Sequence, residues 1–179
     1  MWSKLVLSFL LLLGLSGCAS DEHATLQQIN QPESSLLYGY MDMTDAPSCM
    51  AYFDMKVFPT YDKYIDFEVE NGLFYHEAVP PGTYQLNEFG GTSTFFLFFF
   101  PTLHRYTFLN PDAKFKIATP SMYYLGSFKY VRDKDAFDIQ RIKSPSEGDL
   151  LVRLLPKVRG TKWENVVLGR LKALGINSQ

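Results

Sequence analysis

From residue 36 to residue 141, short hydrophobic runs alternate with clusters of turn residues. In the run 64–70, apolar and acidic residues alternate with the two-residue period of a strand that has one face in a core. Asn71-Gly72 follows this run, and Asn-Gly between two such runs is a strong β-hairpin signal. The pattern predicts a mainly β fold, an antiparallel β-sandwich of about seven to nine strands.

Two runs depart from simple alternation. Residues 95–100, with the sequence FFLFFF, have no polar positions and predict a strand that is buried on both faces. The alternative is an exposed strip that contacts a membrane. Gly126 interrupts the run 123–131, which indicates a β-bulge or a close backbone approach.

Residues 144–179 change to a helical pattern. Leucines recur at helical spacing after 144–147 (SPSE), which has the form of a capping box with proline at the first helical position. A second capping box at 161–164 (TKWE) precedes an apolar stripe that ends at Gly175, a suitable C-cap. We predict two short amphipathic C-terminal helices that pack on the sandwich.

The first 17 residues have the three parts of a secretory signal peptide. A segment charged by Lys4 is followed by an apolar run over 5–13 and by mostly small residues over 14–17. The apolar run is shorter than the roughly 20 residues that span about 30 Å of hydrocarbon. The pattern therefore predicts export and cleavage rather than a membrane-spanning helix.

Residues 15–18, Leu-Ser-Gly-Cys, resemble the lipobox of bacterial lipoproteins. The resemblance implies cleavage before Cys18 and attachment of diacylglycerol to its sulfur, which makes the membrane a partner through this lipid. Two or three acyl chains anchor a protein far more firmly than one. Because Ala19 rather than Asp follows Cys18, the resemblance favours the outer membrane, with the protein facing the periplasm. The alternative is an ordinary secreted protein.

Polar residues dominate 18–34 and predict a flexible tether that begins at the lipidated cysteine. The β-sandwich domain then covers 35–143, and the helical pair covers 144–179. Once Cys18 carries a lipid, Cys49 has no partner within the chain, so it is either a buried thiol or part of an intermolecular bridge. Its position before an apolar strand favours a buried, small hydrophobic role.

Two short stretches of the β region resemble known modules. Residues 78–86 (AVPPGTYQL) resemble a turn and strand of transthyretin-like or carboxypeptidase-regulatory-like β-sandwich modules. Residues 123–128 (YYLGSF) resemble a strand of small bacterial envelope lipoproteins that contain such modules. The resemblance implies a seven-stranded sandwich, and it implies no catalytic residue.

Charge is distributed unevenly along the chain. Residues 21–90 hold twelve acidic and two basic residues, whereas 129–172 hold eleven basic and six acidic residues. Such asymmetry marks an interaction surface in some proteins. In others the two oppositely charged parts face each other within one fold, which is the interpretation we favour here.

Few residues are candidates for catalysis or metal binding. His23, His76 and His104 contain no pair with the i, i+4 spacing of a zinc motif. Asp42 and Asp45 could offer oxygens to Ca²⁺, but such a site needs about six to eight ligands, and turn formation explains both residues. We therefore predict no catalytic residue, no cofactor and no metal site.

Basic residues are concentrated in the predicted C-terminal helices: Lys157, Arg159, Lys162, Arg170 and Lys172. They could bind anionic lipid head groups or an envelope protein partner. The interpretation we favour is that they form the solvated outer face of helices packed on the domain.

Together these features favour a membrane-anchored cell-envelope lipoprotein with a non-enzymatic structural or protein-binding role and no nucleic-acid partner. The chain also has 15 Phe and 11 Tyr. The alternative hypothesis is therefore a binder of a small hydrophobic or lipidic ligand in an aromatic-lined cleft. An enzyme of unknown class is the third hypothesis.

Overall fold

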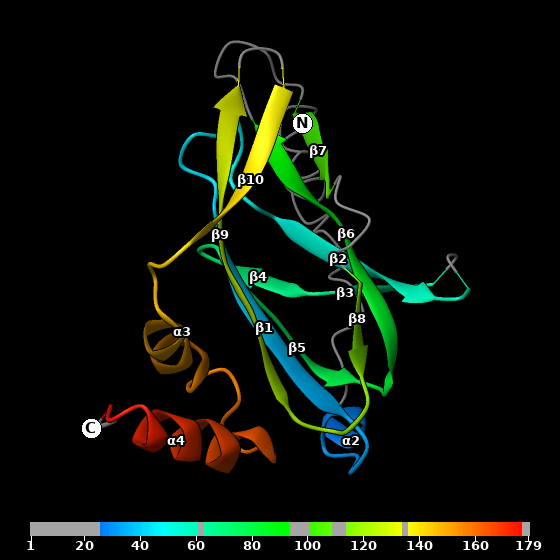
Figure 1. The fold of residues 1–179 in the computed structure, drawn as a ribbon, viewed down its shortest axis with the longest axis vertical. Coiled ribbons are helices and arrows are strands. Elements are labelled where there is room, and N and C mark those ends of the chain that lie inside the picture. The colour runs from blue at the N-terminus through cyan, green and yellow to red at the C-terminus, as the bar shows by residue number, and fades with distance from the viewer. Residues whose placement is uncertain (1–25, 61–62, 94–100, 109–113, 134–135, 177–179) are drawn as a thin grey trace, which may run out of the picture.

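The computed structural model describes residues 26–60, 63–93, 101–108, 114–133 and 136–176. The predicted signal peptide, Cys18, His23 and the phenylalanine run at 95–100 lie outside these residues. The described chain is mainly β, with strands arranged in two sheets (Figure 1). Its elements are α2 (Leu26–Ile29), β1 (Ser35–Asp42), β2 (Tyr52–Phe58), β3 (Tyr64–Asp66), β4 (Glu68–Glu70), β5 (Leu73–Val79), β6 (Gly82–Ser93), β7 (Thr102–Thr107), β8 (Lys114–Ile117), β9 (Met122–Asp133), β10 (Ala136–Ile142), α3 (Glu147–Leu154) and α4 (Trp163–Ala173).

The first sheet has the strand order β10-β9-β1-β5-β4. Its pairings are antiparallel except for β1 with β9, which run parallel. This pair corrects the prediction of a wholly antiparallel fold. Parallel neighbours need a long connection, and here all strands of the second sheet lie between β1 and β9 in the sequence.

The second sheet has the order β3-β2-β6-β7, and β8 also pairs with β6. One edge of β6 is bonded to β2. Along its other edge, β7 pairs with residues 88–93 and β8 pairs with residues 82–85. The strands β7 and β8 therefore lie end to end along β6.

The run 64–70, which the sequence predicts as one strand, is divided between the two sheets. Its first part, β3, pairs with β2, and its second part, β4, pairs with β5. Phe67 stands between them, is buried, and donates its N–H to the carbonyl of Phe53 at 2.8 Å. One short segment thus crosses from sheet to sheet at this edge.

The Asn71-Gly72 hairpin between β4 and β5 is confirmed. The two residues have φ angles of 50° and 81°. A two-residue type I′ turn requires positive φ at both positions, which explains why Asn-Gly is a reliable signal.

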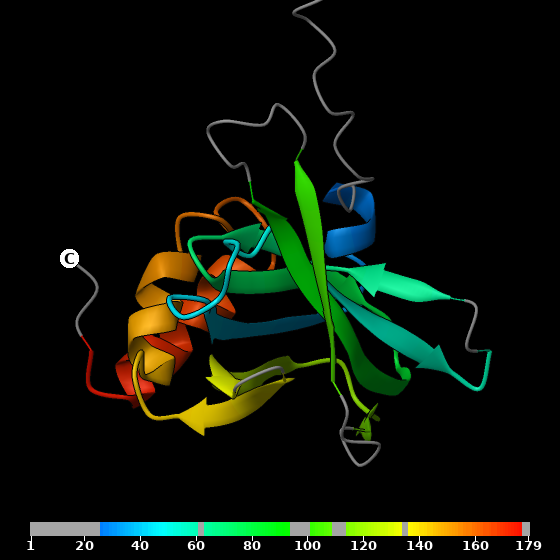
Figure 2. The same cartoon turned by 90° about the horizontal axis from the view of Figure 1, so that it is seen from above.

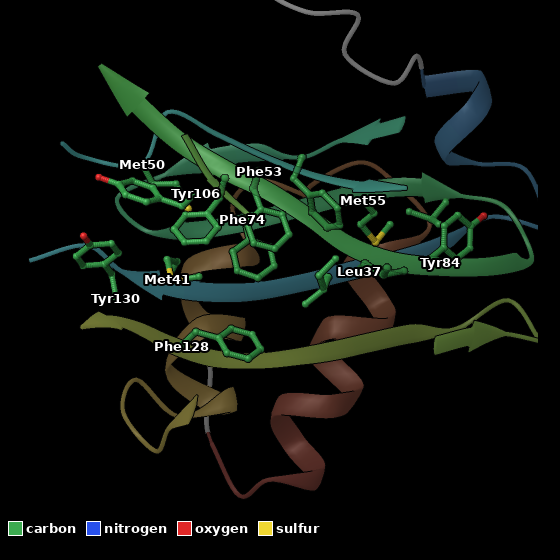
Figure 3. Packing of buried hydrophobic residues seen from close by; sticks show 14 of the residues in the cluster. Leu37, Met41, Met50, Phe53, Met55, Phe74, Tyr84, Tyr106, Phe128 and Tyr130 are labelled. Carbon is green, nitrogen blue, oxygen red and sulfur yellow. The ribbon is translucent and has the colours of Figure 1, made fainter. Parts of the chain in front are cut away.

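The facing sides of the two sheets share one hydrophobic core (Figure 3). At its centre Phe53 of β2 stacks on Phe74 of β5, with ring centroids 3.9 Å apart. The described chain has ten strands, more than the predicted seven to nine. The division of 64–70 into β3 and β4 adds one strand that the hydrophobic pattern does not show.

The helices α3 and α4 cover the opposite face of the first sheet, where a second cluster of buried residues lies (Figure 2). The hydroxyl of Tyr38 in β1 donates to Glu147 at 3.0 Å, and Arg170 donates to both carboxylate oxygens of Glu147 at 2.9 Å. Trp163 donates its indole N–H to the carbonyl of Glu77 at 2.8 Å. These bonds fix both helices to β1 and β5.

Both predicted capping boxes need correction. The first helix begins later than 144–147 suggests, because Ser146 is the N-cap and Asp149 completes the box. The N-cap of α4 is Lys162, which makes no side-chain capping bond. The hydroxyl of Thr161 instead accepts the N–H of Trp163 at 3.2 Å.

Part of the predicted tether packs on the domain. Ile29 is buried with the residues beneath the helices. The backbone N–H of Lys162 donates to Asn30 at 2.9 Å, and its ammonium group donates to the carbonyls of Gln31 and Ser34. Residues 26–34 are therefore held against the start of α4. No helix among the described residues is both long and apolar enough to cross a membrane.

Candidate functional site

A cleft of about 780 Å³ lies between the edges of the two sheets. The second sheet contributes residues from β6, β7, β8 and the chain next to them, and the first sheet contributes residues from β9 and β10. This volume is within the range of roughly 300–1,000 Å³ that is typical of small-molecule sites. The lining residues are Leu86, Thr107, Phe108, Lys114, Phe115, Tyr123, Tyr124, Leu125, Phe128, Phe137, Asp138, Ile139 and Arg141.

The strand order explains why the cleft is on this side. At the opposite edge, the segment 64–70 crosses between the sheets. At the cleft edge, β7 and β8 occupy different halves of β6, and β9 and β10 face them from the other sheet (Figure 1). Leu86 lies on β6 between the segments paired with β8 and β7. The cleft therefore extends inward where the second sheet's edge is interrupted.

The walls of the cleft are aromatic and aliphatic. Phe108 and Phe115 lie on one side, and Phe128 and Phe137 lie on the other. The rings of Phe108 and Phe128 meet edge to face, with centroids 6.2 Å apart. Phe108, Phe115 and Phe137 are half-buried and pack against the main core. Apolar surface thus continues from the core into the cleft, where a ligand could cover it.

Among the described residues, three charged ones line the same cleft: Lys114 at the start of β8, and Asp138 and Arg141 on β10. All three are exposed. The guanidinium carbon of Arg141 lies 5.3 Å from the centre of the Phe128 ring, and the ammonium of Lys114 lies 4.2 Å from that of Phe58. Apolar walls with a few polar groups are the usual composition of a small-molecule site.

Gly126 follows Leu125, a lining residue of the cleft, and lies next to the guanidinium of Arg141. The register of β1 against β9 shifts at Gly39, opposite Gly126, so the predicted bulge is confirmed. Gly126 has a φ of 120°, and a Cβ atom there would lie 3.1 Å from the guanidinium carbon of Arg141. Glycine adopts this backbone conformation readily, and its lack of a side chain leaves room for Arg141.

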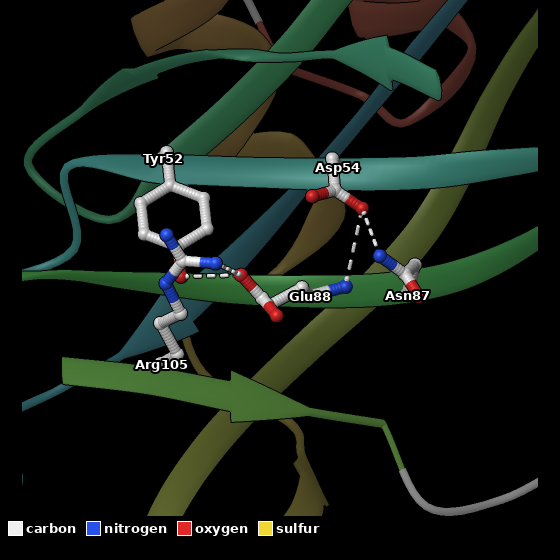
Figure 4. A network of polar contacts seen from close by, with 5 residues as sticks. All are labelled: Tyr52, Asp54, Asn87, Glu88 and Arg105. Atoms are coloured by element: carbon white, nitrogen blue, oxygen red, sulfur yellow. Dashed lines mark hydrogen bonds and ion pairs between the residues drawn. The ribbon is translucent and has the colours of Figure 1, made fainter. Parts of the chain in front are cut away.

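A second group of polar side chains crosses the second sheet (Figure 4). Tyr52 donates its hydroxyl to Glu88 at 2.8 Å, and the amide of Asn87 donates to Asp54 at 2.7 Å. Arg105 lies 3.9 Å from the same Glu88 oxygen. Burial raises the pKa of Asp54. These contacts join β2, β6 and β7 as cross-strand pairs, which stabilise a sheet.

Cys49 is exposed, which corrects the prediction of a buried thiol. It lies between β1 and β2, where its neighbours Ser48 and Met50 are the buried residues. The backbone at this point packs closely on β6, since a Cβ at Gly91 would lie 2.0 Å from the Cys49 carbonyl oxygen. The approach of the main chain turns the Cys49 side chain to solvent.

The other residues considered for catalysis or metal binding make contacts within the fold. His76 lies in β5 beside Phe67, and burial lowers its pKa. His104 lies in β7, and its ring is 2.7 Å from the Ser93 hydroxyl. Asp42 accepts bonds from Thr44, and Asp45 pairs with Lys129 at 2.8 Å. Among the described residues, no three His, Cys, Asp or Glu side chains are grouped to hold a metal ion.

Several cations of the C-terminal helices are bonded within the molecule. Lys157 pairs with Glu70, Arg170 pairs with Glu147, and Lys162 donates to main-chain carbonyls. Lys157–Glu70 and Lys129–Asp45 join the basic part of the sequence to its acidic part. These pairs support the interpretation that the two parts face each other within one fold.

Glu77 is a titratable residue that sequence reasoning missed. It lies in β5 and is 7% exposed. Burial, together with the charge of Glu68, raises the pKa of its carboxyl to about 7. In the sequence it stands between His76 and Ala78 and carries no signal that separates it from the exposed glutamates.

Comparison of the chain with protein-family models, curated proteins and solved structures finds no match. The cleft and its lining residues are therefore the basis on which we argue function.

Proposed function

We propose that this chain is a lipid-anchored protein of the bacterial cell envelope that binds a small apolar ligand without transforming it. The observation that carries the proposal is the cleft of about 780 Å³ with half-buried aromatic walls. Two facing sheets with a shared core support a β-sandwich as its scaffold. The binding function, which the sequence offered as its alternative hypothesis, thus becomes our main proposal.

A series of neutral alcohols tests the cleft as the binding site. Each buried methylene contributes about 0.8 kcal/mol, so from octanol to decanol to dodecanol we expect the dissociation constant to tighten roughly tenfold per step. Titration calorimetry of the mature domain measures this. Replacement of Ile139, which is half-buried in the cleft wall, by Trp should fill the cleft and weaken binding of every alcohol.

Leu103→Trp is the matched control, since Leu103 is 50% exposed on β7 and does not line the cleft. This variant should bind the alcohols as the unchanged protein does. Absence of binding, or equal binding by Ile139→Trp and the unchanged protein, would remove the cleft as the ligand site.

The anchor rests on the lipobox resemblance at 15–18 and on the chemistry of Cys18. Cys18→Ser removes the sulfur that would carry diacylglycerol. We expect the variant to lose labelling by radioactive palmitate in bacterial cells and to leave the membrane fraction. A variant that is still labelled and still sediments with membranes would contradict the lipid anchor.

A further inference from the structure

We propose that the ligand of the cleft is an anionic amphiphile, whose head group is bound by Arg141 while its chain lies among the aromatic walls. This inference rests on the proposed function, because it names the chemical class of the ligand in the same cleft. The charged residues that line the cleft, Arg141, Lys114 and Asp138, support this class of ligand.

Arg141 is held in place before any ligand arrives. Its guanidinium donates to the carbonyl of Leu125 at 3.2 Å and lies over the Phe128 ring. The missing side chain of Gly126 leaves the space that the guanidinium occupies. A guanidinium has five N–H donors in a fixed plane, so a group bonded at one of them can still present others to an anion.

Lys114 supplies a second positive charge from the other sheet. It begins β8 and pairs with Gln85 on β6, whereas Arg141 belongs to β10 in the first sheet. The ammonium of Lys114 lies 4.2 Å from the centre of the Phe58 ring, and Phe58 does not line the cleft. Lys114 therefore adds positive charge beside the cleft, and Arg141 is the residue that bonds the head group.

Asp138 also lines the cleft, and its negative charge offsets only part of the positive charge of Arg141 and Lys114. Its oxygens accept bonds from the N–H of Ile139 at 2.8 Å and from the amide of Gln140 at 3.1 Å. Among the described residues, the charged ones that line the cleft are two cations and one carboxylate, Arg141, Lys114 and Asp138. A carboxylate or phosphate head on an apolar chain complements both the charge and the walls.

Dodecanoate and dodecanol test the head group at constant chain length. We expect dodecanoate to bind roughly tenfold more tightly than the alcohol, because hydrogen bonds to charged groups are the stronger ones. Arg141→Gln should remove most of this difference between dodecanoate and dodecanol. Asp138→Asn should increase the preference for dodecanoate.

Lys116→Gln is the control, since Lys116 is an exposed cation of the same strand that does not line the cleft. It should retain the full preference. Dodecyl phosphate, measured in parallel, distinguishes a phosphate head from a carboxylate head. The melting temperature of each variant shows whether it is folded.

The outcomes separate this inference from the proposed function. Binding of dodecanol and dodecanoate with equal affinity would overturn the anionic head group and leave the apolar cleft intact. A preference for dodecanoate that survives in Arg141→Gln would also overturn the inference. Binding of neither compound would contradict the proposed function itself.

Discussion

At the scale of single residues, Glu77 links the burial of one carboxyl to the stability of the whole protein. Its pKa is raised from 4.5 to about 7 in the folded state. The folded protein therefore holds this proton more tightly than the unfolded chain does. Any stability that depends on the protonated carboxyl is complete below the unfolded pKa and is lost as pH rises through the folded pKa.

We therefore expect Glu77→Gln to flatten the pH dependence of stability. Between about pH 5 and pH 8 the unchanged protein should lose free energy of unfolding relative to the variant, by about 1 kcal/mol or more. Urea denaturation at the two pH values measures the difference. Glu33→Gln, at an exposed position, serves as the control, and a Glu77→Gln variant with the same pH dependence as this control would contradict the account.

At the scale of elements, the C-terminal helices act as a cover for the first sheet. Leu36, Tyr38, Leu73 and Tyr75 belong to the cluster beneath them. Without the helices, this face of the sheet would expose apolar side chains to water. The cations of the helices take part in this packing through bonds to β4, α3 and the segment before β1.

Adjacent valines in α4 test this role. Val167 is fully buried and Val166 is 41% exposed. We expect Val167→Ala to lower the free energy of unfolding by about 2 kcal/mol, because it leaves a cavity. Val166→Ala should change it by less than about 0.5 kcal/mol. Similar losses in the two variants, measured by urea denaturation, would mean that α4 does not dock in this orientation.

Local sequence signals predicted those elements that depend on local backbone geometry. Asn71-Gly72 fixes a turn because both residues tolerate positive φ, and Gly126 marks a bulge for a related reason. The division of 64–70 could not be predicted, because its two-residue period is the same whether its partner is β2 or β5. The prediction that the Cys49 side chain is buried was wrong, because its orientation depends on the close approach of β6 to the backbone at Cys49.

At the scale of the whole molecule, the two edges of the paired sheets differ. The segment 64–70 joins the sheets at one edge, and the cleft lies at the other. The abundance of Phe and Tyr suggested an aromatic cleft but not its position. That position depends on β8 and β10, strands from different sheets whose residues meet only in the folded chain.

The most direct test of the central claim is a map of where an apolar ligand binds. In NMR spectra of the mature domain titrated with dodecanol, we expect shifts at Phe108, Phe115, Leu125 and Phe137, which line the cleft. Val152 and Val166, which are exposed on the helices, should not shift. Changes at the helices with none in the cleft, or no changes at saturating dodecanol, would contradict the proposal that this cleft is the functional site.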